Sequence, residues 1–317
     1  MTETSHPLAP DAPWIVLKFG GTSVARVERW HSIAELAQAR CAEGARVVIV
    51  VSALSGVTDA LKAIADAGDV ADRRVRAEAL AQRHIDFAVE LGVDPALLAP
   101  WLAQLSELVA GGSDHRCEGF YAWQAELLSL GELMSSTLGN AVLRAAGVNS
   151  RWLDARDCFE AQPQPNQSEW SCWLAASVPA ARDDALRERL ASRQAAIFIT
   201  QGFIARNAAG CTVLLGRGGS DTSAAYFGAC LGADRVEIWS DVAGLFSANP
   251  RDVPGARLLR RLDFEEAQEI ATTGAKMLHP RCLSPLRRAG VPLWIRDTAH
   301  PGLTGTVIGP EAPDAAP

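Results

Sequence analysis

The segment Lys18-Phe-Gly-Gly-Thr-Ser23 places a cation, two adjacent glycines and two hydroxyl groups in one short stretch. Residues 14–17 before it are apolar and predict a strand, and residues 24–30 predict a helix, with Thr22 or Ser23 as its N-cap. Glycines at such a turn allow close backbone approach to a ligand, and free N–H groups at a helix start favour an anion. The segment therefore predicts a phosphate site. The alternative is a tight turn with a surface lysine.

A second glycine-rich segment, Gly216-Arg-Gly-Gly-Ser-Asp221, combines a guanidinium, a hydroxyl and a carboxylate. Arg217 could grip a carboxylate or a phosphate through two hydrogen bonds. Glycines that lead into a helix, predicted here to run to about residue 231, form a second anion cradle. The alternative is a surface loop capped by Ser220 or Asp221.

Several single residues outside these segments could also take part in chemistry. Glu132 lies in an otherwise apolar helix, where an acid is costly unless paired, and its partner could be a substrate ammonium or an internal arginine. Asp241 follows a predicted strand, and Lys276 follows a glycine and could close over phosphates. His279 could be a base, although a structural, hydrogen-bonded histidine is the favoured interpretation.

Strands and helices alternate along the predicted chain. Apolar runs predict strands at 46–52, 150–154, 195–200, 235–239 and 291–295, with a hairpin at 203–215. Helices are predicted at 71–112 with a break at Asp94-Pro95, at 118–146, at 217–231 and at 263–272. This alternation predicts a doubly wound, mostly parallel α/β sheet with some antiparallel strands. Ligands bind such sheets outside the carboxyl ends of the strands, where the polar segments lie.

Composition excludes several functional classes. The 317 residues are 48% hydrophobic with a net charge of −7, which argues against a nucleic-acid-binding face. No run approaches the ~20 apolar residues that span a bilayer, and the N-terminus lacks a signal-peptide pattern. The seven cysteines are odd in number and form no C-x-x-C, so neither a disulfide framework nor a zinc site is indicated. We expect a cytoplasmic protein with no membrane or nucleic-acid partner.

Taken together, the motifs resemble the catalytic domain of aspartokinases, in the amino acid kinase superfamily. The resemblance covers about residues 14–309 and rests on KFGGTSV at 18–24, VSALSGVTD at 51–59, Gly131-Glu132, TQGFI at 200–204, GRGGSD at 216–221, SDVAG at 240–244, NPR at 249–251 and GAKMLHP at 274–280. It implies a three-layer α/β/α sandwich with a mostly parallel central sheet. It also implies ATP-dependent phosphorylation of the L-aspartate side chain to 4-phospho-L-aspartate, the first step toward lysine, threonine, methionine and diaminopimelate.

The resemblance assigns roles by position. It implies catalytic roles for Lys18, Asp221 and Lys276. It implies aspartate contacts from Ser52, Thr58, Glu132, Phe203, Arg217 and Ser220. It implies nucleotide contacts from Lys18, Gly20, Gly21, Ser23, Ser240, Asp241, Phe246, Arg251, Lys276 and Met277. ATP and Mg²⁺ are the implied cofactors, with Asp221 and Asp241 both candidates to orient the metal or a lysine.

The expected organisation is a tail at 1–13, a kinase domain at 14–309 and a linker or tail at 310–317, with no ACT-type regulatory domain. The N-terminal part of the kinase domain would bind aspartate, and the part from about residue 216 would bind ATP. A homodimer and a fused C-terminal enzyme such as diaminopimelate decarboxylase stay open. The alternatives are a non-catalytic amino-acid-binding paralogue and a superfamily kinase for another amino acid.

Overall fold

An eight-stranded sheet runs through the centre of the computed structural model, which describes residues 9, 11–112, 119–248, 252–253, 255–272 and 278–310. Its strands are β1 (Trp14–Phe19), β2 (Arg46–Val51), β3 (Ser150–Leu153), β4 (Ile197–Gln201), β7 (Arg235–Ser240), β8 (Arg261–Leu262), β9 (Leu293–Asp297) and β10 (Thr306–Ile308). They lie in the order β3-β4-β2-β1-β7-β9-β10-β8. Neighbours are parallel except β9 and β10, which confirms the predicted sheet.

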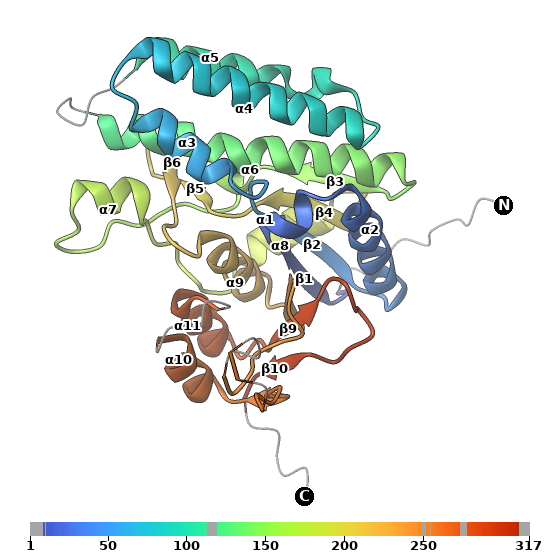
Figure 1. Ribbon diagram of the computed structural model, residues 1–317. Helices are drawn as coiled ribbons and strands as arrows, with labels where there is room; N and C mark the ends of the chain where they lie inside the picture. The colour runs from blue at the N-terminus through green and yellow to red at the C-terminus, as the bar shows by residue number, and fades with distance from the viewer. Residues whose placement is uncertain are drawn as a thin grey trace, which may run out of the picture.

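Helices cover both faces of this sheet (Figure 1). The first group is α1 (Gly21–Val24), α2 (Val27–Ala42), α3 (Val57–Ala65), α4 (Val70–Glu90), α5 (Ala99–Gly111) and α6 (Phe120–Ala145). The second group is α8 (Asp184–Ala191), α9 (Gly219–Leu231), α10 (Phe264–Thr272) and α11 (Pro280–Ala289). The remaining elements are α7 (Glu169–Leu174), the 3₁₀ turns η1 (Pro95–Leu98) and η2 (Ala155–Asp157), and the hairpin of β5 (Ile204–Arg206) and β6 (Thr212–Leu214).

Alternate residues of the central strands enter two separate cores. In β1, Leu17 and Phe19 belong to the core under the first helix group, while Trp14 and Val16 belong to the core under the second. Because both faces are covered, these strands are mostly apolar, which is why their sequences show apolar runs. The layers are those of the predicted α/β/α sandwich.

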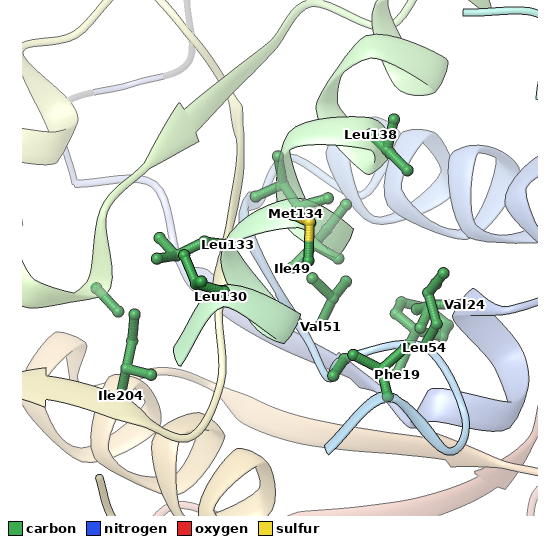
Figure 2. Close-up of a cluster of buried hydrophobic side chains, with 14 of the residues drawn as sticks. Phe19, Val24, Ile49, Val51, Leu54, Leu130, Leu133, Met134, Leu138 and Ile204 are labelled. Atoms are coloured by element: carbon green, nitrogen blue, oxygen red, sulfur yellow. The ribbon is translucent and has the colours of Figure 1, made fainter. Parts of the chain in front are cut away.

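Helix α6 is held on the sheet by a leucine-rich face. Figure 2 shows Leu130, Leu133, Met134 and Leu138 of this helix packed with strand side chains that include Ile49. All five side chains are fully or almost fully buried, so the rotation of α6 about its axis is set by packing. With this rotation, Glu132 lines the cleft described below.

The start of the chain's first helical region differs from the prediction. Helix α1 is only four residues long, Gly20 is its N-cap, and Thr22 and Ser23 lie inside it. The N-cap assignment of Thr22 or Ser23 is therefore wrong. The sequence also did not predict α7, α8, β8 or β10, because these elements are too short to show a period.

Among the described residues, no helix is both long and apolar enough to cross a membrane.

Candidate active site

A cleft of about 750 Å³ opens at the carboxyl ends of β1 and β2, between α3, α6 and the start of α9. It collects residues that the sequence analysis singled out in separate motifs. The predicted site residues that line it are Lys18, Ser52, Thr58, Glu132, Phe203, Arg217, Ser220 and Asp221. The expectation that loops at the strand ends converge is confirmed for this set.

Lys18 and Asp221 form an ion pair at the base of the cleft. The lysine Nζ lies 2.5 Å from Oδ1 of Asp221, and the two side chains are only 12% and 15% exposed. Lys18 is the last residue but one of β1, and Asp221 lies in the first turn of α9. This ion pair connects the two glycine-rich segments, 18–23 and 216–221.

Glu132 is buried on α6 with its carboxyl group at the cleft. Its residue exposure is 3%, and its Oε2 atom has no hydrogen-bond partner in the part of the chain that the structure describes. Burial raises the pKa of this carboxyl to about 8, and backbone hydrogen bonds at Ala53 and at Glu132 itself offset the rise only in part. No arginine ion pair to Glu132 is found within the described ranges. A buried, unpaired acid that faces a cleft suits a cationic ligand group.

The turn at 216–221 presents Arg217 to the cleft as an exposed side chain. Helix α9 begins from Gly218 without a side-chain cap, so the alternative of a loop capped by Ser220 or Asp221 is wrong. Phe203 packs directly against this turn, since a Cβ atom on Gly219 would lie 2.5 Å from its Cδ2 atom. Phe203 has a φ of 70°, which is strained for a bulky residue, and its N–H donates to Ser223 Oγ at 2.9 Å. Such strain persists only where surrounding contacts impose it and is common at binding sites.

The first glycine-rich turn lies against the loop after β2. A Cβ atom on Gly21 would lie 2.7 Å from the Ala53 carbonyl oxygen, so only glycine fits there. Gly20 is half-buried as the N-cap of α1. The Ser23 hydroxyl is buried and lies 3.3 Å from Thr298 Oγ1.

The predicted nucleotide-binding residues at the end of β7 and after it do not line the cleft. In the parallel pair of β1 and β7, Phe19 is the register partner of Trp239, so Ser240 ends its strand beside the first turn. The Ser240 hydroxyl contacts the Val242 backbone at 3.3 and 3.4 Å. Asp241 is exposed, while Phe246 is half-buried and forms a β-bridge with Leu258. Arg251, Lys276 and Met277 lie outside the described residues.

Comparison with known proteins decides the family. The sequence profile of the Amino acid kinase family matches residues 13–297. The chain belongs to this family. It is 33% identical over 296 residues to lysine-sensitive aspartokinase 3 of Escherichia coli, covering 93% of this chain and 64% of that protein. It is 32% identical over 311 residues to the chloroplastic bifunctional aspartokinase/homoserine dehydrogenase of Daucus carota, covering 94% of this chain and 32% of that protein.

The fold of this chain matches that of a solved aspartokinase. The crystal structure of E. coli aspartokinase III in complex with aspartate and ADP superposes with a TM-score of 0.80 at 31% identity. The match covers 95% of this chain and 65% of that one. The chain thus spans slightly less than two thirds of the length of the E. coli aspartokinase that it matches.

This amino acid kinase has further cleft residues that the sequence analysis missed. They are Lys62, Asp66, Gln124, Leu128, Trp170, Leu174 and Leu214. The glycines of the predicted anion cradle, Gly216, Gly218 and Gly219, also line the cleft. A usable signal was present, because Lys62 and Asp66 follow Thr58 at intervals of four on α3. Gln124 and Leu128 precede Glu132 at the same interval on α6. Residues four apart share one face of a helix.

His279 has a structural role. Its Nδ1 accepts a hydrogen bond from the Arg281 N–H at 3.3 Å and caps α11. Burial, aided by the nearby guanidinium of Arg281, lowers the pKa of this imidazole below its ordinary value. Across the described ranges, no group of three or more His, Cys, Asp or Glu side chains could hold a metal ion.

Proposed function

We propose that this chain transfers the γ-phosphoryl group of ATP to the side-chain carboxylate of L-aspartate, giving 4-phospho-L-aspartate and ADP. The observation that carries the proposal is the placement of Lys18, Glu132 and Arg217 in a single cleft. These three charges match the three charged groups of the reaction: a phosphate, an ammonium and a carboxylate. The solved E. coli aspartokinase III bound to aspartate and ADP, at 31% identity, supports the same reaction for this chain.

Aspartate recognition follows from charge complementarity. Glu132 accepts the α-ammonium group of the substrate, and Arg217 binds its α-carboxylate with two hydrogen bonds. Ser52, Thr58, Phe203 and Ser220 complete the aspartate site from the same cleft. The substrate's side-chain carboxylate then points toward Lys18 at the base.

The chemistry requires positioning and charge neutralisation. The attacking carboxylate has an ordinary pKa of about 3.9, so it is already ionised at pH 7 and needs no general base. The barrier comes from bringing this anion to a polyphosphate anion. Lys18, held by Asp221, supplies positive charge where the phosphoryl group passes, and Lys276 is proposed to act with it.

The proposed kinase domain covers residues 14–309, and its part from about residue 216 is proposed to bind most of the nucleotide. The first glycine-rich turn, at residues 18–23, is proposed to contact the phosphates. The proposed contacts are Gly20, Gly21, Ser23, Ser240, Asp241, Phe246, Arg251, Lys276 and Met277. Mg²⁺ would be held mainly by phosphate oxygens and water, with Asp241 as the exposed carboxylate nearby, and would neutralise phosphate charge.

A coupled assay tests the function directly. ADP formation by the purified chain should require L-aspartate, ATP and Mg²⁺ together, and hydroxylamine should trap the acyl phosphate as a hydroxamate. Turnover that prefers another amino acid would support a different superfamily kinase. Aspartate binding without any ADP formation would support a non-catalytic paralogue.

Arg217→Ala is expected to raise the KM for aspartate about 10- to 100-fold, since it removes a charge-assisted contact of about 1.5–3 kcal/mol. The KM for ATP should stay within twofold. Initial rates against each substrate in turn measure both values. Arg74→Ala, at an exposed position of α4, is the matched control and should behave as wild type. An unchanged aspartate KM with weakened ATP binding would reassign Arg217 to the nucleotide.

A further inference from the structure

The N-terminus of α11 packs directly under the turn that carries Arg217. Gly218 has a φ of +68°, and a Cβ atom there would lie 2.4 Å from Cβ of His279. A Cβ atom on Gly216 would lie 3.0 Å from Nη1 of Arg281. The glycine turn is therefore seated against the first residues of this helix.

Arg281 also binds the turn by hydrogen bonds. Its Nη1 donates to the Leu215 carbonyl oxygen at 2.6 Å, directly before the turn. Its Nη2 donates to the Ala176 carbonyl oxygen at 3.0 Å, in the segment after α7. The two segments are tied to each other as well, since the Ala176 N–H donates to the Leu214 carbonyl oxygen at 2.8 Å.

One half-buried guanidinium thus holds two walls of the cleft. The first wall is the 216–221 turn, and the second is α7, whose Trp170 and Leu174 line the cleft. Arg281 itself is absent from the cleft's lining. Arg281 therefore does not contact a ligand in the cleft directly.

We infer that Arg281 is a positioning residue for aspartate binding. A glycine-rich turn loses much conformational freedom when it is ordered, and a site that is ordered in advance avoids that cost when the ligand binds. Arg281 orders the turn before aspartate arrives and holds Arg217 and Ser220 at a set distance from α7. The inference rests on the proposed function and adds a role that lies outside the substrate-contacting residues.

Three variants test the role of Arg281. Arg281→Met removes the two hydrogen bonds to backbone carbonyls and a third, from Nη2 to Ser177 Oγ at 3.5 Å. It should raise the KM for aspartate roughly 10-fold, because small displacements of a binding group are costly, and should leave the KM for ATP within twofold of wild type. Arg281→Lys keeps the charge but has fewer hydrogen-bond donors. Its KM for aspartate should therefore lie between those of wild type and Arg281→Met. Arg288→Met is the matched control, because Arg288 is exposed on the same helix and its side chain bonds only to Ser284 among the described residues. It should match wild type.

The outcomes separate the inference from the function on which it rests. If wild type shows no aspartate-dependent turnover, the proposed function fails. If wild type is active and Arg281→Met keeps the wild-type aspartate KM, only the positioning role fails. A purely structural role would lower the melting temperature while leaving the ratio of the two KM values unchanged, and that result would also overturn the inference. If Arg281→Met does not fold, the same ratio of the aspartate KM to the ATP KM is measured in Arg281→Lys. A raised ratio supports the positioning role, and an unchanged ratio overturns it.

Discussion

Lys18→Met is expected to lower kcat roughly 1,000-fold or more, because a charged group aimed at the transferring phosphoryl contributes most in the transition state. Lys18 is the cation at the base of the cleft, and its ion pair with Asp221 fixes its direction. Methionine has similar length without the charge. The measurement is kcat at saturating ATP and aspartate, together with the melting temperature.

Lys62→Met provides the matched control for this experiment. Lys62 lines the same cleft but is exposed on α3 and is not part of the Lys18–Asp221 ion pair. Its replacement should leave kcat within a few-fold of wild type. A folded Lys18→Met enzyme with near-normal kcat would contradict the role proposed for Lys18.

Glu132→Gln is expected to weaken aspartate binding and to stabilise the ligand-free protein at alkaline pH. The folded-state pKa of about 8 lies above the ordinary value of 4.5 because the carboxyl is buried. Below pH 4.5 the group is protonated in both states and has no effect. As the pH rises from 4.5 to about 8, the unfolded chain alone releases the proton, so wild type loses stability, on the order of 4 kcal/mol by pH 8. Glutamine avoids this loss.

Denaturant unfolding at pH 5, 7 and 8.5 measures the stability effect. The advantage of Glu132→Gln over wild type should grow with pH and then level off above about pH 8. A constant difference would show that Glu132 is not titrating in this range. In the same variant, the KM for aspartate should rise about 10- to 100-fold, by the loss of one charge-assisted contact.

Aspartate binding should also displace the proton from Glu132. The substrate ammonium favours the ionised carboxylate, so binding at pH 7 should release close to one proton in wild type and none in Glu132→Gln. Calorimetry in two buffers with different ionisation enthalpies measures that release. Equal proton release in both proteins would place the substrate ammonium elsewhere.

Local patterns in the sequence were sufficient for most of the architecture. The apolar runs at 14–17 and 46–52 predicted strands, and the structure places them as neighbours at the centre of the sheet. The long helix at 118–146 and the break at Asp94-Pro95 were likewise predicted, because period and turn chemistry are local properties. Short elements such as α7 and β10 escaped prediction, since their boundaries depend on contacts with distant segments.

The sequence by itself determined the family, the α/β class and the residue types available for phosphoryl transfer. Only the tertiary structure decided which charges meet. It paired Asp221 with Lys18, left the Oε2 atom of Glu132 without a partner among the described residues, and set Arg281 beneath the Gly216–Asp221 turn. Each of these facts depends on residues far apart in the chain that the sheet brings together. Glycine turns and apolar runs are encoded within a few residues, whereas burial and ion pairing are properties of the packed molecule.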